Sequence, residues 1–112
     1  MRKIKKIKKP WGYEEILETN PHYTVKRLFM KKGHQCSYQY HQQKKETIVV
    51  LSGKLLIIGE DNKRVFEPGQ SITIPPLEKH RMKADKEDCL YLECSTSELD
   101  DVIRIKDDYD RL

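Results

Sequence analysis

The sequence predicts an all-β fold, either a sandwich or a barrel, and three observations support this prediction. Short segments rich in β-branched and aromatic residues recur along the chain, and several alternate with the period of two that strands show. Turn-forming residues separate these segments at regular intervals. No long amphipathic helical pattern competes with them. Strands joined in succession by tight turns also favour a Greek-key jelly roll, whose mouth can hold a small ligand.

The strand signal is clearest in one series of segments. In chain order these are YTVKRLFM (23–30), CSYQYH (36–41), ETIVVL (46–51), KLLIIG (54–59), KRVFE (63–67), SITI (71–74) and CLYLEC (89–94). Two weaker segments, 13–17 and 101–105, are predicted as outer strands. Glycine, proline, asparagine or aspartate mark the turns between them, at 31–33, 52–54, 60–63, 67–70 and 75–79. Only the last six residues, DDYDRL, are compatible with a helical turn.

The composition indicates a compact core inside a strongly charged surface. Hydrophobic residues make up 37% of the 112 residues and charged residues 36%, a length that fits a single domain over 1–112. The longest apolar run, TIVVL, is too short to cross a membrane, and the basic N-terminus lacks the apolar region of a secretory signal. We therefore expect a cytoplasmic protein without a membrane partner.

The N-terminal segment, residues 1–9, holds most of the excess positive charge. Six lysines or arginines lie between residues 2 and 9, and the formal net charge of the chain is +4. No aromatic residues interleave these lysines to stack bases, so no nucleic-acid partner is expected. We expect a solvated segment that covers a sheet edge or crosses to a partner. The three cysteines lack C-x-x-C spacing and are expected to stay reduced.

One constellation of side chains points to metal chemistry. Along segment 36–41, Gln39 and His41 share a face, and Cys36 is expected on the opposite face. The turn after His41 delivers Glu46 to the start of the next strand, and His80 follows the turn at 75–79. Gln43 would share the face of His41 only if the strand continued, and we expect it to be an exposed turn residue.

This donor set suits one divalent first-row ion rather than a structural zinc held by thiolates. Two imidazoles, a carboxylate and an amide oxygen are typical ligands of Zn, Mn, Fe, Co or Ni, with zinc slightly favoured. Four protein ligands on an octahedral ion leave two positions open for water or substrate. The sequence thus predicts a reactive or binding site.

The same spacing resembles the two motifs of the cupin superfamily. Gly33 is followed by five residues to Gln39, and the series continues through His41 and Glu46 to a closing glycine. The second motif begins at Gly69 and reaches His80 with the family spacing. Leu77 and Ala84 replace its glycine and asparagine, which suggests a different turn conformation and leaves the ligand positions intact.

A narrower resemblance covers nearly the whole chain. KPWGYEEIL, YTVKRLFMKKG, SYQYH, GQSITIP and DDVIR..DDYDR are similar to the C-terminal cupin domain of type II phosphomannose isomerases. The resemblance implies a single cupin (double-stranded β-helix, jelly-roll) barrel, a homodimer, and a metal set of Gln39, His41, Glu46 and His80. It also implies a mannose-6-phosphate isomerase activity in nucleotide-sugar or polysaccharide synthesis. The chain departs at 42–48, where Lys44 stands near the family's arginine and Thr47 and Ile48 replace a His-Trp pair.

An aldose–ketose isomerase also needs a base and cations for the phosphate. Glu93 is the candidate base if it points into the barrel, the alternative being an exposed or salt-bridged carboxylate. Lys26 and Arg27 lie on opposite faces of one strand, so only one of them can line the cavity. Arg104 is the further candidate cation. Trp11 is expected in the core or at a dimer contact.

Two other classes of function stay open at this point. One is a different metal-dependent cupin enzyme, such as a dioxygenase or an epimerase. The other is a non-enzymatic module that binds a sugar or sugar phosphate, which would keep its ligand affinity in EDTA.

Overall fold

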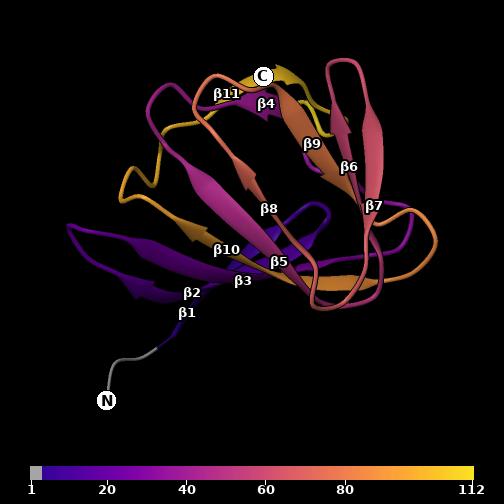
Figure 1. Ribbon diagram of the computed structural model, residues 1–112, viewed down its shortest axis with the longest axis horizontal. Helices are drawn as coiled ribbons and strands as arrows, with labels where there is room; N and C mark the ends of the chain where they lie inside the picture. Colours follow the sequence, from indigo (N-terminus) through magenta and orange to yellow (C-terminus); the bar gives the residue numbers. More distant parts are fainter. Residues whose placement is uncertain (1–3) are drawn as a thin grey trace.

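Eleven strands in two antiparallel sheets make up the described part of the chain, residues 4–112 of a computed structural model (Figure 1). The strands are β1 (Lys5–Lys9), β2 (Gly12–Thr19), β3 (Thr24–Met30), β4 (Tyr38–Tyr40), β5 (Glu46–Ser52), β6 (Leu55–Gly59), β7 (Lys63–Phe66), β8 (Ser71–Ile74), β9 (His80–Lys83), β10 (Cys89–Ser95) and β11 (Ile103–Lys106). No helix in residues 4–112 is long and apolar enough to cross a membrane.

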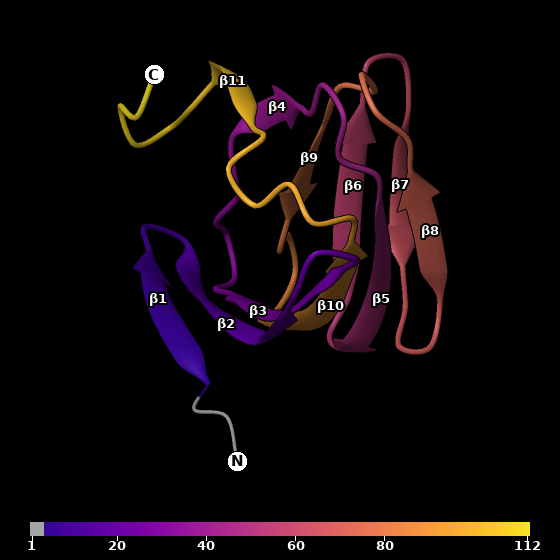
Figure 2. The ribbon, with the colours of Figure 1, turned by 90° about the vertical axis from the view of Figure 1, so that its left-hand side faces the viewer.

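The sheets face each other as two layers. One has the strand order β1-β2-β3-β10-β5-β8 and the other β11-β4-β9-β6-β7 (Figure 2). Among the described residues no ladder joins β8 to β7 or β1 to β11, so the two sheets form an open jelly roll rather than a closed barrel. The all-β jelly-roll prediction is confirmed.

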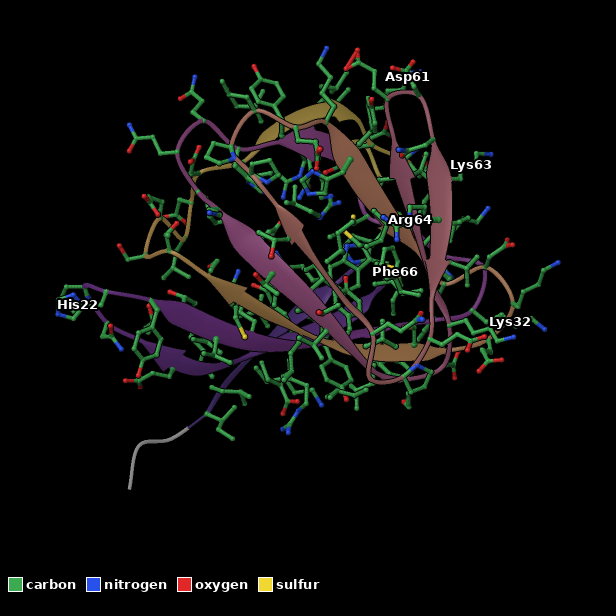
Figure 3. All side chains as sticks on the ribbon, in the orientation of Figure 1. His22, Lys32, Asp61, Lys63, Arg64 and Phe66 are labelled. Carbon is green, nitrogen blue, oxygen red and sulfur yellow. The ribbon has the colours of Figure 1, made fainter. Side chains whose placement is uncertain are left out.

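The core lies between the layers because the central strands alternate buried and half-buried residues with a period of two. Residues of both sheets contribute to one apolar cluster: Trp11, Leu28, Met30, Cys36, Ile48, Val50, Leu55, Ile57, Phe66, Ile74, Met82, Ala84, Cys89 and Tyr91. Phe66 points inward from β7, while His22 projects from the tip of the β2–β3 hairpin (Figure 3). Trp11 is only 4% exposed, as the prediction of core packing requires.

The structure corrects the predicted elements in four places. Strand β9 was not predicted, and neither was β1, which replaces the expected solvated segment. Strand β4 is shorter than segment 36–41. Residues 107–112 form a turn, closed by the Arg111 amide donating to Asp107, and not a helical turn.

Strand β1 covers the edge of the larger sheet by pairing antiparallel with β2, in a register that sets Lys5 opposite Ile16 and Lys9 opposite Gly12. Residues Lys5–Lys9 of the N-terminal segment therefore cover a sheet edge of their own chain, and residues 1–3 of that segment lie outside the described part. The strand could not be recognised in the sequence, because lysines occupy both of its faces and the segment lacks the alternation of apolar and polar residues.

Leu77, at the motif's glycine position, keeps a backbone that glycine favours. Its φ is 73°, in the left-handed region, and its amide donates to the carbonyl of His41 at 2.7 Å. The replacement of the motif's glycine by leucine therefore does not remove the left-handed backbone at this position. The side chain is 64% exposed, so little packing compensates for the steric cost.

Replacing Leu77 with glycine is expected to stabilise the fold by about 0.5–1 kcal/mol. Relief of the left-handed backbone contributes about 1–2 kcal/mol, partly offset by the greater freedom of glycine in the unfolded chain. Urea denaturation measures the difference. Leu51→Gly, on a strand residue of 41% exposure, is the control and should destabilise. A Leu77→Gly variant less stable than the wild type would contradict the strain.

Candidate metal centre

Three neighbouring strands change from apolar to charged at the same end of the inner sheet face. The apolar layer pairs Tyr91 of β10 with Leu28 of β3 and Val50 of β5. Two residues further along β10, Glu93 lies opposite Lys26 of β3. The side chains of this charged pair and of the apolar layer are all buried. Glu46 follows at the start of β5, opposite Ser95 and Ile74. Burying charged groups is costly unless they are paired, so this end of the molecule is the candidate functional site.

A cluster of His41, Glu46 and His80 forms the innermost part of this charged end. Glu46 Oε1 lies 3.2 Å from His41 Nε2 and 3.0 Å from His80 Nε2. All three residues are at most 2% exposed, and one ligand atom from each lies within 4.8 Å of the others. The structure thus brings together three of the four predicted ligands.

Gln39 lies beside this cluster. It pairs with His80 in the β4–β9 ladder and lines the same cavity as His41, and its Oε1 accepts a hydrogen bond from Ser37 Oγ at 2.6 Å. This contact places Ser37 and Gln39 on one face of the segment. Cys36 does not point away from the site but lines the same cavity, because regular strand geometry begins only at Tyr38.

Backbone carbonyls fix the protonation of both imidazoles. His41 Nδ1 is hydrogen-bonded to the carbonyl of Asp101, and His80 Nδ1 to that of Glu78 at 2.8 Å. Because a carbonyl only accepts, each Nδ1 carries a proton, and Nε2 can donate a hydrogen bond to Glu46 only when the ring is protonated. A neutral ring instead turns its Nε2 lone pair towards the carboxylate, and a cation between them then removes the repulsion.

The electrostatics of the cluster fit a bound cation. Burial lowers the pKa of His80, but the hydrogen bond and charge of Glu46 outweigh it and raise that pKa. Burial raises the pKa of Glu46, and its contacts with His41 and His80 bring that pKa well below the ordinary value. Within residues 4–112, Glu46 Oε2 is buried without a hydrogen-bond partner. A divalent ion at the two Nε2 atoms and this carboxylate would satisfy all three groups, so the residues fit the predicted metal.

Glu93 and Lys44 form the next layer. Lys44 Nζ lies 3.4 Å from Glu93 Oε2 and 3.9 Å from Glu46 Oε2, and its residue is only 5% exposed. Burial, with the nearby charge of Glu46, raises the pKa of Glu93 to about 7 despite Lys44 and Lys26. Glu93 therefore points inward, and its carboxyl is paired with Lys44.

A cavity of about 530 Å³ opens from this layer towards β1 and β11. Lys26, Gln39, His41, Glu93 and Arg104 all line it. Arg27 lies outside the cavity and pairs with Glu15 at 2.9 Å. Of the two neighbouring cations on β3, Lys26 is therefore the one that faces the cavity.

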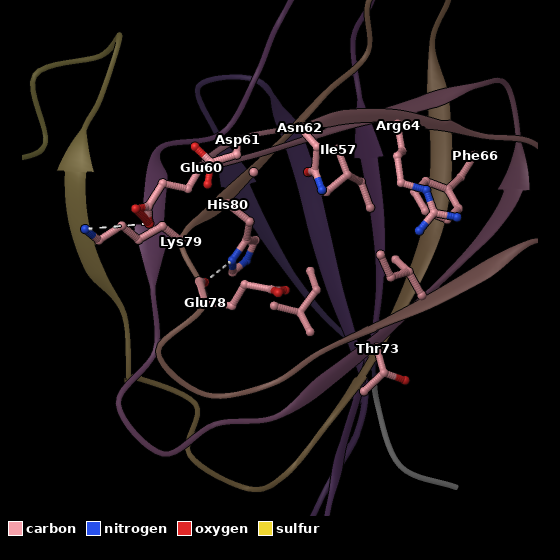
Figure 4. Close-up of a pocket in the computed structure, with 13 residues that line it drawn as sticks. Ile57, Glu60, Asp61, Asn62, Arg64, Phe66, Thr73, Glu78, Lys79 and His80 are labelled. Carbon is pink, nitrogen blue, oxygen red and sulfur yellow. Dashed lines mark hydrogen bonds and ion pairs between the residues drawn. The ribbon is translucent and has the colours of Figure 1, made fainter.

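A second cavity, of about 450 Å³, lies on the other side of the cluster near β7 and β8. Its wall includes His80, whose ring approaches the Glu78 carbonyl (Figure 4). His41 of the candidate metal centre therefore lines one cavity, and His80 lines the other.

Asp101 is the positioning residue that sequence reasoning missed. Its carbonyl holds His41, and its carboxylate accepts three backbone hydrogen bonds, from Gln42 at 3.0 Å, Gln43 at 2.7 Å and Lys44 at 2.8 Å. Gln43 is exposed, as predicted. These amide contacts lower the pKa of Asp101, led by the one from Gln43.

Asp101→Asn is expected to destabilise the fold by about 1 kcal/mol at neutral pH, as loss of a charged cap on backbone amides does. Because the folded-state pKa is lowered, the advantage of the carboxylate is present above the unfolded pKa. It is lost as the pH falls through the folded pKa, where both states are protonated. Urea denaturation of both proteins at pH 7 and near pH 3 should show a difference that shrinks in acid. Asp85→Asn, on an exposed carboxylate, is the control.

Solved structures of similar shape identify the fold. KdgF from Halomonas sp. superimposes with a TM-score of 0.77 at 18% identity, covering 88% of this chain and 89% of that one. A cupin-like protein from Thermotoga maritima gives 0.76 at 19% identity, covering 85% of this chain and 76% of that one. The fold is that of a cupin. Residues 1–107 match the family model described as "Mannose-6-phosphate isomerase C-terminal", and the chain belongs to this family.

Curated relatives are much longer proteins. A mannose-1-phosphate guanylyltransferase of Escherichia coli is 31% identical over 98% of this chain and 24% of the relative. The xanthan biosynthesis protein XanB of Xanthomonas campestris is 29% identical over 96% of this chain and 24% of its own length. The chain thus spans about a quarter of the relatives it matches.

Proposed function

We propose that the chain is a metal-dependent sugar-phosphate isomerase that interconverts mannose 6-phosphate and fructose 6-phosphate for nucleotide-sugar or polysaccharide synthesis. The observation that carries the proposal is a cavity lined by His41 of the His–Glu–His cluster, by the buried carboxyl of Glu93 and by several cations. The family and the names of the relatives support the substrate class.

His41, Glu46 and His80 would hold the metal, with Gln39 as the fourth ligand. A divalent ion there supplies Lewis-acid polarisation of the substrate carbonyl. Each imidazole is oriented by its own backbone carbonyl, so both Nε2 atoms are held in place before the ion binds.

Glu93 would move the proton. Its carboxylate takes the proton from C2 of the open-chain aldose and returns it to C1, while the hydroxyl proton passes from O2 to O1 and the carbonyl from C1 to C2. Lys44 holds this carboxylate at 3.4 Å. Arg104 and Lys26, on two walls of the cavity, would attract the phosphate.

Elemental analysis of the purified protein, combined with an assay of fructose 6-phosphate formed from mannose 6-phosphate, tests the proposal. Stoichiometric Zn, Mn, Fe, Co or Ni and turnover that EDTA abolishes are expected. Metal-bound protein without turnover on mannose 6-phosphate would overturn the isomerase assignment.

Lys44 favours one second candidate, a metal-free module that binds a sugar phosphate without turnover. Its ammonium group contacts both Glu46 and Glu93, which gives these carboxylates a cation from within the chain. This candidate predicts that EDTA leaves the affinity for mannose 6-phosphate unchanged, whereas the isomerase requires a loss of turnover.

A further inference from the structure

Strand β1 presents two different faces. Lys5, Ile7 and Lys9 line the cavity of the candidate site, while the intervening Lys6 and Lys8 do not. Lys6 instead lies over the ring of Tyr13, its Nζ 4.0 Å from the ring centroid. The continuous pairing of β1 with β2 fixes this alternation, so the inner lysines are held towards the cavity.

The cavity has more positive than negative groups. Its lining includes six cationic side chains and three carboxylic acids: Lys5, Lys9, Lys26, Lys44, Arg104 and Arg111, against Glu14, Glu93 and Asp100. Some of these cations have partners, since Lys44 contacts Glu93 and Arg111 binds Asp107 at 2.8 Å. The excess of positive charge is greatest where the cationic side chains have the fewest ion-pair partners.

That place is the mouth between β1 and β11, which lie on the same side of the molecule (Figure 2). Glu14 is shared by two ammonium groups, Lys9 at 3.9 Å and Lys26 at 3.6 Å. Arg104 Nε, on β11, is buried without a hydrogen-bond partner among the described residues. Within residues 4–112 neither Lys5 nor Arg104 forms an ion pair.

We propose that the inner face of β1, Lys5 and Lys9, forms a phosphate subsite with Arg104 across the mouth. Its ligand is the phosphomonoester dianion of a small sugar phosphate. Lys9 reaches Glu14, which also contacts Lys26, and Lys26 lies opposite Glu93 in the sheet. A phosphate at the mouth would therefore leave the sugar between the subsite and the candidate base. This inference rests on the proposed function for the sugar and on the cavity charges for the phosphate.

Two double variants of the same strand test the subsite. Lys5→Gln/Lys9→Gln removes two charges from the inner face, and Lys6→Gln/Lys8→Gln removes two from the outer face. Calorimetric titration measures the binding of inorganic phosphate, mannose 6-phosphate and mannose to each protein. The inner variant should bind inorganic phosphate and mannose 6-phosphate at least about tenfold more weakly than the wild type, as the loss of one charged hydrogen bond predicts. Its affinity for mannose should equal that of the wild type. The outer variant should resemble the wild type.

Lys5→Gln alone removes an exposed lysine without touching Glu14, so it keeps the test valid if the inner double variant fails to fold. Equal losses in the inner and outer variants would indicate general attraction by the strand and overturn the subsite. So would a wild type that binds neither phosphate. If the wild type showed no turnover, and only the inner variant lost phosphate binding, the isomerase would be refuted and the subsite retained.

Discussion

Replacing Glu46 with glutamine is expected to lower the affinity for divalent metal by more than about a hundredfold. One oxygen, Glu46 Oε1, lies close to both His41 Nε2 and His80 Nε2, so this carboxylate joins the two imidazoles into one cluster. An amide has a similar shape but no charge. Residues that only orient a metal ligand cost about ten- to a hundredfold when changed, so the ligand itself should cost more. Titration of EDTA-treated protein with Zn²⁺ and Mn²⁺ gives the affinities.

Glu15→Gln provides the matched control for this experiment. Glu15 lies on β2 outside the cavity and pairs with Arg27, so the same chemical change is made away from the cluster. Its metal affinity should equal that of the wild type. Tight stoichiometric binding by the Glu46→Gln variant would show that the metal site lies elsewhere in the protein.

The three clustered residues, His41, Glu46 and His80, could be located from the sequence because short chain segments restrict their positions. Only four residues separate His41 from Glu46, and alternation along a strand decides which neighbours can face the same ion. His80 was placed by motif spacing, and the β4–β9 ladder brings it beside Gln39. Gln39 itself stays a predicted ligand.

Other parts of the site depend on contacts that local patterns do not encode. Asp101 binds the loop after His41 from about sixty residues away, and nothing near either segment indicates the pairing. Alternation shows that Lys26 and Arg27 face opposite ways, but only the packing of β3 between β2 and β10 decides which one is inside. Lys44 was noted as a departure from the family, and its ion pairs become visible only when β5 and β10 are adjacent.

The polarity of the inner face explains how one fold holds both a core and a charged site. Strands β3, β5 and β10 each bury apolar residues at one end and a charged residue at the other. The charged residues fall in neighbouring layers because the strands are antiparallel and in register. Ion pairs of Glu46 and Glu93 with Lys44, and of Lys26 with Glu14, offset the cost of burial. The shared lysine also places the candidate base beside the candidate metal centre.

Glu93→Gln is expected to lower kcat for the isomerisation of mannose 6-phosphate by about 10²- to 10⁴-fold, the usual contribution of a positioned base. The amide keeps the volume of the side chain beside Lys44 but cannot accept the C2 proton. Metal content should stay that of the wild type, because Glu93 is not among the clustered ligands. Steady-state kinetics with coupled detection of fructose 6-phosphate, and elemental analysis of the same sample, measure both quantities.

Glu14→Gln separates a base from a carboxylate that only shapes the cavity. Glu14 lines the same cavity and is also buried, but its contacts are Lys9 and Lys26 rather than Lys44. Its kcat should fall by less than about tenfold, since it makes no proton transfer. If both variants lost kcat equally, the loss would reflect the charge balance of the cavity. If Glu93→Gln kept its kcat, or lost its metal, Glu93 would not be the base.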